Sequence, residues 1–281
     1  MIDAGQKLAP SGGCVQTQWE SVGAVREQIA PALPGFTLEI LPEIDSTNSE
    51  LMRRAKDGQT DPVLLVAEHQ TAGRGRLGRT WQDAGVRPDS PDLMFSLGLP
   101  LAPPDWSGLS LAVGVSVAQS LHPDVRLKWP NDLWLEQRKL GGILIETAPL
   151  SEAHRRYVVI GIGINITPRG IQGFSTAPAC LQDLAPEMGA ALALSRIAAP
   201  LVAAVQQFEQ LGFAHFQRSF NTLDALAGCE VVTSGSHSVN GVARGVDAAG
   251  ALLVLGDKGV VKISSSEVSV RPTGAFQSSA H

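Results

Sequence analysis

The sequence of 281 residues has few of the residues that build disulfide scaffolds and zinc sites. Its three cysteines, Cys14, Cys180 and Cys229, are scattered along the chain and never form a C-x-x-C pair. The six histidines are dispersed as well, and no H-E-x-x-H sequence occurs. These absences argue against a disulfide-stapled secreted fold and against a Cys/His zinc centre, and they favour a reducing compartment.

Long apolar runs and a surplus of basic residues are also missing. No uninterrupted apolar run approaches the ~20 residues that span a bilayer. The first residues, MIDAGQKLAPSGG, lack the basic-then-apolar order of a secretory signal. The charge balance is acidic, with 22 Lys and Arg against 27 Asp and Glu. We therefore expect a cytoplasmic protein that binds no membrane and is not a general nucleic-acid binder.

What is present is a composition of 44% hydrophobic residues and a pattern of short apolar segments separated by turns. The expected helices are Trp19–Ile29, Ser49–Lys56, Ser107–Leu121 and, mostly helical, Leu192–Leu226. The expected strands are Phe36–Leu41, Pro62–Glu68, Leu93–Leu99, Val125–Trp129, Leu133–Leu135, Gly142–Glu146 and Tyr157–Ile166. Because the links between the later strands are too short for parallel crossovers, the sequence predicts an α+β fold with a mixed, largely antiparallel sheet.

The pattern also predicts where the chain divides into parts. After residue 228, about five short strands with glycine turns in ~45 residues predict a small β-barrel. We expect an N-terminal extension (1–35), a catalytic domain (36–227), a C-terminal β-module (228–272) and a tail (273–281). The extension offers room for one short helix but not for the two helices of a DNA-reading unit.

The stretch GRGRLGRTW, residues 73–81, has glycines in the G-x-G-x-x-G spacing of a dinucleotide-binding turn. That motif requires a strand before it and a helix that opens on it. The strand is predicted, but the residues that follow, RTWQDAGVRPDSPDL, contain two prolines and no apolar periodicity. The match to the dinucleotide motif is therefore accidental.

Two interpretations of this stretch remain: a solvated Arg/Gly loop, or a loop that orders around a phosphate. Three features favour the second. The loop lies between two buried strands, its glycines alternate with Arg74, Arg76 and Arg79, and Trp81 supplies an apolar anchor. Backbone amides and guanidinium groups can then close on one anion. No Walker A sequence occurs that would supply an ordinary P-loop.

A second candidate site lies in KWPNDLWLEQRKLGGILIE, residues 128–146. Lys128 and Lys139 are placed to converge across a turn, and Asn131 and Asp132 add ligands suited to a Mg²⁺-nucleotide. Taken alone, Pro-Asn-Asp is more often a simple turn, and a lysine after it a surface lysine. In GIGINIT, residues 161–167, Asn165 either satisfies buried backbone or faces a ligand, and the sequence does not choose.

Together these motifs resemble the bacterial biotin protein ligases. The resemblance rests on STN (46–48), GRGRLGRTW (73–81), KWPND (128–132), KLGGILIE (139–146) and GIGIN (161–165), in order and at fitting separations. RGVDAAGALLV (244–254) also resembles the SH3-like module of that family. The resemblance covers about residues 36–272 and implies a class II synthetase-like catalytic domain. It implies activation of biotin with ATP and Mg²⁺ to biotinyl-5′-adenylate, followed by transfer to one lysine of a carrier domain.

The resemblance also implies roles for individual residues. Those implied to bind biotin are Ser46, Thr47, Asn48, Gln70, Arg74, Gly75, Arg76 and Lys139. Those implied to bind the nucleotide are Arg76, Arg79, Trp81, Lys128, Asn131 and Asn165. Those implied to be catalytic are Lys139, Arg74, Arg76 and Asp132, with Asp132 also the candidate Mg²⁺ ligand.

The chain departs from the family in two places. The 45 residues before STN lack the pattern of a winged-helix DNA-binding domain, so we expect the ligase form that does not bind DNA. The segment 82–93 is longer and more polar than expected, and a tolerated surface insertion is the favoured explanation. The implied partner is the biotin carboxyl carrier protein of acetyl-CoA carboxylase, and a homodimer is left open. Alternatives are a lipoate ligase-like enzyme, a biotin-sensing repressor and an inactive adenylate-binding module.

Overall fold

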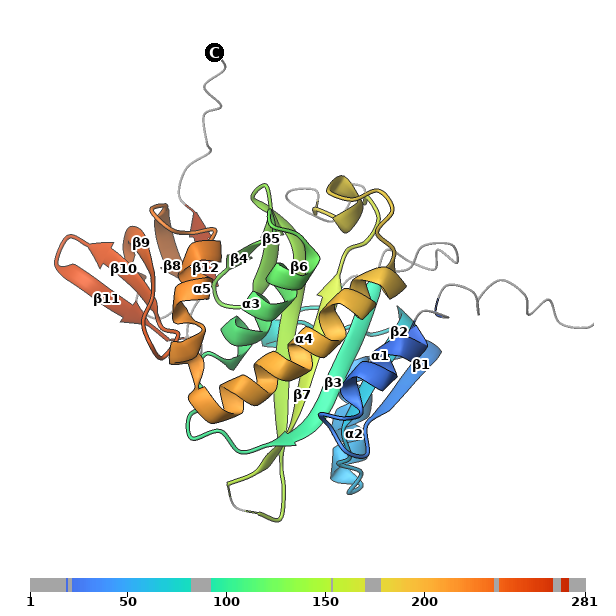
Figure 1. Cartoon of the computed structure of the whole chain (residues 1–281). Helices are drawn as coiled ribbons and strands as arrows, with labels where there is room; N and C mark the ends of the chain where they lie inside the picture. Colours follow the sequence, from blue (N-terminus) through green and yellow to red (C-terminus); the bar gives the residue numbers. More distant parts are fainter. Residues whose placement is uncertain are drawn as a thin grey trace, which may run out of the picture.

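Short apolar segments assemble into two sheets with helices around them (Figure 1). A computed structural model describes residues 19, 22–81, 92–152, 154–169, 178–234, 238–264 and 269–272. The helices are α1 Gly23–Ile29, α2 Thr47–Lys56, α3 Leu109–Leu121, α4 Ala190–Leu211 and α5 Gln217–Leu223. The larger sheet contains β1 Thr37–Ile44, β2 Val63–Gln70, β3 Leu93–Leu101, β4 Arg126–Lys128, β5 Asp132–Leu135, β6 Arg138–Pro149 and β7 Arg156–Ile164.

The larger sheet has the strand order β1-β2-β3-β7-β6-β5-β4. Only β1 and β2 are parallel neighbours, because the chain between them passes through α2; every other neighbouring pair is antiparallel. The predicted fold class is confirmed. Strand β6 is longer than the predicted segment Gly142–Glu146, because it pairs with β5 at its start and with β7 up to Pro149. Lys139 therefore lies inside a strand.

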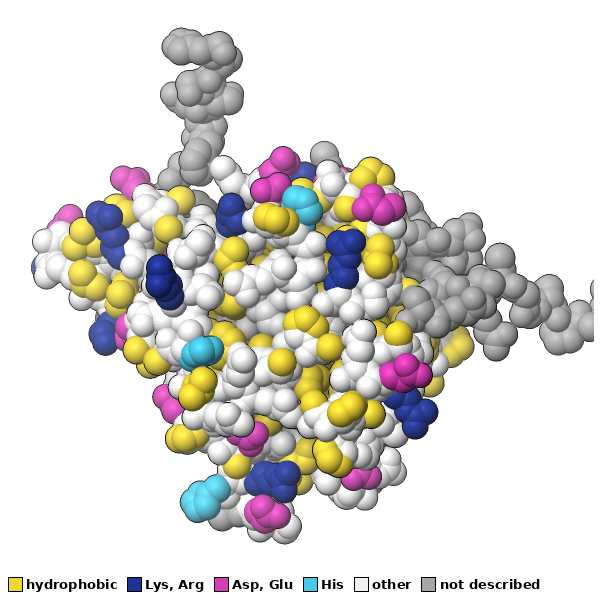
Figure 2. Space-filling view, viewed as in Figure 1, with side chains coloured by type: hydrophobic (Ala, Val, Ile, Leu, Met, Phe, Trp, Pro, Cys, Tyr) yellow, Lys and Arg dark blue, Asp and Glu magenta, His cyan; other side chains and the backbone are white. Residues whose placement is uncertain are grey.

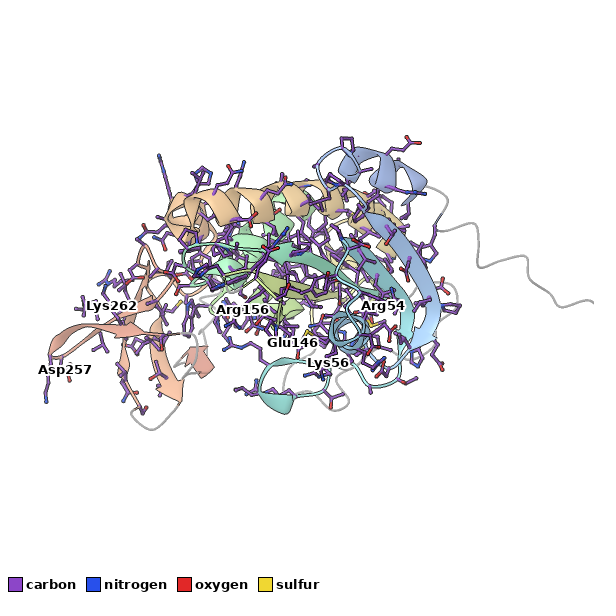
Figure 3. All side chains as sticks on the ribbon, turned by 90° about the horizontal axis from the view of Figure 1, so that it is seen from below. Arg54, Lys56, Glu146, Arg156, Asp257 and Lys262 are labelled. Carbon is purple, nitrogen blue, oxygen red and sulfur yellow. The ribbon has the colours of Figure 1, made fainter. Side chains whose placement is uncertain are left out.

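The sheet is covered differently on its two faces. Helices α1, α3 and α4 share one core with it, and α3 is buried on nearly every side because its sequence is apolar throughout. Helix α2 packs on the opposite face, where Leu51 lies among Val63, Leu65 and Tyr157. Figure 3 shows these layers edge-on, with α4 above the sheet and α2 below it.

Helix α4 is rich in apolar residues, although Arg196 and Glu209 interrupt the apolar run. By length and mean hydropathy alone, its 22 residues would be long and apolar enough to cross a membrane. Half of its most apolar window is buried inside the protein, where it packs along α3 and the sheet. We interpret α4 as the core helix of this fold. On the face that it covers, charged side chains are dispersed rather than gathered in one patch (Figure 2).

The smaller sheet follows α5. It contains the predicted short strands in one antiparallel sheet, in the order β11-β10-β9-β8-β12. Their bounds are β8 Glu230–Ser234, β9 Asn240–Val246, β10 Leu252–Gly256, β11 Gly259–Ile263 and β12 Ser269–Pro272. It is fastened to the larger unit through the buried indole of Trp129, whose Nε1 donates to the carbonyl of Gly250 at 3.0 Å.

The N-terminal part of the described chain belongs to the main core. Helix α1 packs against α4 through Val25 and Ile29, and the indole nitrogen of Trp19 donates to Glu68 at 2.8 Å. Residues 1–18, most of the predicted insertion 82–93 and the predicted tail 273–281 lie outside the described residues.

Candidate functional site

The resemblance motifs meet on the face of the large sheet that carries α2. They form two neighbouring groups of side chains: a buried polar group at the start of α2, and a charged group at the turn between β4 and β5. The loop 71–81 between β2 and the next strand lies against both. Strands β2 and β3 are antiparallel neighbours, whereas a dinucleotide-binding motif lies between two parallel strands, so the glycine pattern is not part of a dinucleotide fold.

The start of α2 builds the polar group. Ser46 is the N-cap, extended at φ −163°, and its hydroxyl accepts from the amide of Ser49 at 3.4 Å. The next residue, Thr47, donates its backbone N–H to Oε1 of Gln70 at 2.8 Å. Ser46, Thr47, Asn48 and Gln70 are all buried. The sequence-predicted pocket residues therefore lie together.

A serine that the sequence analysis did not single out connects this group. The hydroxyl oxygen of Ser96, on β3, lies 2.7 Å from Oγ1 of Thr47 and 2.7 Å from Oδ1 of Asn48. Ser96 is fully buried, as expected for a group whose hydrogen bonds are made inside the protein. A polar residue in an otherwise apolar strand is the signal that could have identified it.

Glu146, on β6, is the second residue missed by the sequence analysis. Its carboxylate accepts from the Asn48 amide at 3.0 Å and receives the Arg74 guanidinium through both Nη atoms, at 3.1 and 2.9 Å. Arg74 also donates to Ser49 at 3.3 Å. The Arg74 side chain is therefore held at the pocket by a neighbouring acid.

Trp81 fastens the far end of the loop to the sheet. Its ring lies against Gly163 and Gly142, where an added Cβ would be 2.6 Å and 3.5 Å from the indole. Gly75 and Arg79 join through a backbone hydrogen bond of 2.7 Å that closes the loop on itself. The glycines in GIGIN and KLGG thus leave space for the tryptophan that ends the arginine motif.

Arg76 enters the charged group from the loop. Its Nη1 lies 3.4 Å from Oδ1 of Asn131, whose own amide nitrogen donates to the carbonyl of Ile143 at 2.8 Å. Burial lowers the pKa of Arg76; nearby Asp132 opposes this shift, and Arg79 adds to it. A half-buried guanidinium in such surroundings is a strong site for an anion.

Lys139 reaches the same group from β6. Its ammonium pairs with Asp132 at 2.7 Å and lies 5.8 Å from the centre of the Trp81 ring. Lys128 has a different neighbour, since its ammonium lies 4.5 Å over the ring of Trp134. The expectation that the two lysines converge is thus corrected: Lys128 on β4 and Lys139 on β6 are separated by β5, and their ammonium groups contact different partners. A small pocket nevertheless joins Lys128 with Asn131 and Asp132.

Two predicted nucleotide contacts lie at the border of this arrangement. The side chain of Arg79 is exposed on the loop. Asn165 is buried, and its amide nitrogen donates to the carbonyls of Lys139 at 3.3 Å and Ala179 at 2.9 Å. Of the two interpretations left open for Asn165, the satisfaction of buried backbone is therefore observed.

A metal ion would find one carboxylate here, that of Asp132. Within the part of the chain that the structure describes, there is no group of three or more His, Cys, Asp or Glu that could hold a metal by itself. Mg²⁺ bound with a nucleotide usually takes one or two protein carboxylates and completes its shell with phosphate oxygens and water. The donor set fits a Mg²⁺ ion that arrives with its nucleotide.

Comparison with known proteins identifies related chains. Residues 41–165 match the Biotin/lipoate A/B protein ligase family, and residues 229–271 match the Biotin protein ligase C terminal domain. The Bifunctional ligase/repressor BirA of Escherichia coli (strain K12) is 35% identical over 259 residues, covering 87% of this chain and 77% of that protein. The Biotin--[acetyl-CoA-carboxylase] ligase of Mycobacterium tuberculosis is 34% identical over 267 residues, covering 88% of this chain and 95% of that protein.

The fold agrees with these similarities. The solved biotin protein ligase from Aquifex aeolicus in complex with biotin and ATP superimposes with a TM-score of 0.70 at 29% identity, covering 84% of this chain and 99% of that one. Sequence motifs, sheet order and the C-terminal module all agree with that likeness. The chain belongs to the biotin protein ligase family.

Proposed function

We propose that this chain is a biotin protein ligase that forms biotinyl-5′-adenylate from biotin and ATP and transfers the biotinyl group to a carrier lysine. One observation carries the proposal. A cluster of buried polar side chains and a group of residues suited to an anion, Arg76, Asn131 and Lys139, lie side by side along one arginine-glycine loop. A substrate with a small polar head and an acidic tail fits both.

The polar pocket is proposed to hold the ureido ring of biotin. A ureido group offers one carbonyl acceptor and two N–H donors, and Ser46, Thr47, Asn48 and Gln70 supply short, buried hydrogen-bonding groups of both kinds. Gly75, on the loop, is the backbone position proposed to approach the ligand. Arg74 is proposed to act on the pocket through Glu146, with which it is paired.

The charged group is proposed to carry the adenylation step. A carboxylate oxygen of biotin attacks the α-phosphate of ATP, the new P–O bond forms, and pyrophosphate leaves. Lys139 and Arg76 supply fixed positive charge where negative charge increases. Lys139 is paired with Asp132 in the structure and would exchange that carboxylate for the substrate oxygens.

The nucleotide is proposed to lie along the turn between β4 and β5. Lys128 and Asn131 line its pocket, Arg79 and Trp81 close the loop over it, and Asn165 supports the backbone of Lys139 from behind. Asp132 would hold the Mg²⁺ ion that accompanies the phosphates, which would neutralise part of their charge.

The second step is proposed to use the amine of a carrier lysine. That amine, in its neutral form, attacks the acyl carbon of the adenylate; the amide C–N bond forms, AMP leaves with the electrons of the mixed-anhydride bond, and the amine proton passes to water. Asp132, freed from Lys139, is proposed to orient the attacking amine. A biotin carboxyl carrier protein is the proposed acceptor. That the chain acts in the cytoplasm without DNA or membrane, and as a homodimer or monomer, stays a prediction.

A substrate competition tests the proposal. Purified protein is incubated with ATP, Mg²⁺ and equal concentrations of biotin and lipoate, and the adenylates formed are separated and identified by mass spectrometry. We expect biotinyl-adenylate alone. Formation of lipoyl-adenylate in preference to the biotin product would overturn the assignment in favour of a lipoate ligase.

A further inference from the structure

Glu146 is the acidic side chain that contacts both the polar pocket and the loop. Figure 3 shows it on the face of the sheet that carries α2 and the arginine-glycine loop. One carboxylate oxygen, Oε2, accepts from Asn48 and from Arg74, and the other, Oε1, accepts from Arg74 alone. Because an ionised carboxylate has no proton to give, every partner that it holds must be a donor.

This requirement fixes the orientation of the Asn48 amide. Its nitrogen faces Glu146 and the carbonyl of Leu144, at 3.0 and 3.2 Å, so its oxygen faces Ser96. An amide oxygen can only accept, and Ser96 has one proton, which must therefore point to Asn48. The 2.7 Å contact between the hydroxyls of Ser96 and Thr47 is then made with the Thr47 proton, for which Oε1 of Gln70, at 3.3 Å, is the other acceptor.

The backbone leaves the amide no room to adapt. A Cβ at Gly161 would lie 2.0 Å from Oδ1 of Asn48, so the amide fills the space above the glycine. Asn48, Ser96 and Thr47 are buried, where an unsatisfied polar group is costly. The orientation of the Asn48 amide, and with it the position of the Ser96 proton, is thus set from one end, by the carboxylate of Glu146 together with the carbonyl of Leu144.

We propose that Glu146 is a positioning residue for biotin: it orients the hydrogen-bond donors and acceptors of the pocket and, with the same carboxylate, holds Arg74 and the loop closed over it. This inference rests on the proposed function. The contact of Glu146 with Asn48 is expected to contribute most to biotin binding. The ion pair with Arg74 contributes less, because the Arg74 side chain is 46% exposed and an ion pair in water contributes little by itself.

Glu146→Gln is the sharpest substitution, since it keeps the shape and removes one acceptor. If the oxygen of the new glutamine faces Asn48, the glutamine NH₂ group faces Nη2 of Arg74. If the glutamine amide is flipped, its NH₂ group faces the amide nitrogen of Asn48 instead. In both arrangements two N–H donors face each other without an acceptor between them. We expect the biotin dissociation constant, measured by calorimetry without ATP, to rise about tenfold or more.

Coupling to the loop is measured with a double-mutant cycle. The rate at which biotinyl-adenylate leaves the protein is compared for wild type, Arg74→Gln, Glu146→Gln and the double variant. Because Glu146→Gln already disturbs the Arg74 contact, adding Arg74→Gln to it should accelerate release much less than Arg74→Gln does alone. Glu152→Gln, which removes an exposed acid paired with Arg155 at 3.9 Å, is the matched control and should equal wild type.

The outcomes separate the two proposals. If wild type binds no biotin and forms no adenylate, the proposed function is wrong and this inference with it. If wild type is active and Glu146→Gln, shown to be folded by thermal unfolding, binds biotin as tightly as wild type, Glu146 is not a positioning residue. Strictly independent effects of the two substitutions on adenylate release would contradict the coupling.

Discussion

Three cations of the candidate site each contact a specific neighbour. Arg74 pairs with Glu146, Arg76 contacts Asn131, and Lys139 pairs with Asp132. Side chains already fixed by such contacts need little rearrangement when charge develops on a substrate. At the scale of single residues, the site is therefore preorganised for an anion.

Lys139 is expected to act mainly in the transition state of adenylation. Lys139→Ala should lower the rate of adenylate formation by about 10²–10³. ATP binding should be weakened far less, since an interaction made in the transition state affects kcat rather than KM. Lys139→Arg should restore little, because a planar guanidinium does not place its charge where the ammonium lay. Quench-flow measurement of single-turnover adenylation checks these values.

The same experiment has a clear negative result. If Lys139 were simply a half-exposed lysine paired with Asp132, both variants would form adenylate at nearly the wild-type rate. Lys258→Ala, at an exposed lysine in the turn between β10 and β11, controls for the loss of one positive charge elsewhere in the protein.

Arg76 is expected to retain the intermediate. Its guanidinium enters from the loop and lies half-buried beside Asn131, so Arg76→Ala should release biotinyl-adenylate faster while biotin binding changes less. The loss of a charge-assisted hydrogen bond costs roughly 1.5–3 kcal/mol, about a tenfold effect or more. The release rate is measured by trapping free adenylate; an unchanged rate would exclude this role of the loop.

At the scale of elements, glycines determine how the loop docks on the sheet. Gly163, on the central strand β7, faces the indole of Trp81, and an added Cβ would lie 2.6 Å from its ring. Gly163→Ala should therefore displace Trp81 and cost about 1–3 kcal/mol of stability, as overpacking does. Adenylate retention should fall as well.

Thermal unfolding and adenylate release measure the two effects together. The matched control is Gly189→Ala, before α4, where an added Cβ meets nothing within 4 Å and φ is −102°. Wild-type retention in Gly163→Ala would show that the packing of Trp81 does not hold the loop.

Elements and motifs were more predictable from the sequence than contacts between them. The order of helices and strands followed from apolar periodicity, and the Arg loop and KWPND were identified by their residue types. Glu146 and Ser96 were missed because a single polar residue in a strand does not show which side chain it will contact. Their partner Asn48 lies 98 and 48 residues away, a separation that no local pattern encodes. The length of β6 was likewise set by pairing with neighbours.

At the scale of the whole molecule, a buried acid lies where the two sheets meet. Asp224 forms a bridge with Leu127 just before the C-terminal sheet, and its Oδ1 accepts from the amide of Leu226 at 2.9 Å. Its other oxygen is buried and has no hydrogen-bond partner among the residues that the structure describes. Burial raises the pKa of Asp224 from 3.8 to about 6, partly opposed by the Leu226 amide.

This shift gives a prediction for the pH dependence of stability. The folded protein holds the Asp224 proton more tightly than the unfolded chain, so the stability contributed by this group is present below pH ~4 and is lost as the pH rises through about 6. Asp224→Asn keeps the acceptor and removes the charge. It should be more stable than wild type at pH 7.5, by up to roughly 3 kcal/mol, and the difference should shrink toward pH 4.

Denaturant unfolding of the two proteins at several pH values checks the direction. Asp257→Asn, at an exposed turn residue seen in Figure 3, corrects for the loss of one negative charge. A stability difference between wild type and Asp224→Asn that is constant with pH would contradict the assignment.

The most direct test of the whole account is transfer of biotin to a carrier. The protein is mixed with biotin, ATP, Mg²⁺ and a biotin carboxyl carrier domain, and the carrier is followed by intact-mass and peptide mass spectrometry. We predict one biotinyl group on one carrier lysine, dependent on ATP and absent when that lysine is replaced by arginine. A carrier that stays unmodified while active ligase modifies it under the same conditions would contradict the central claim.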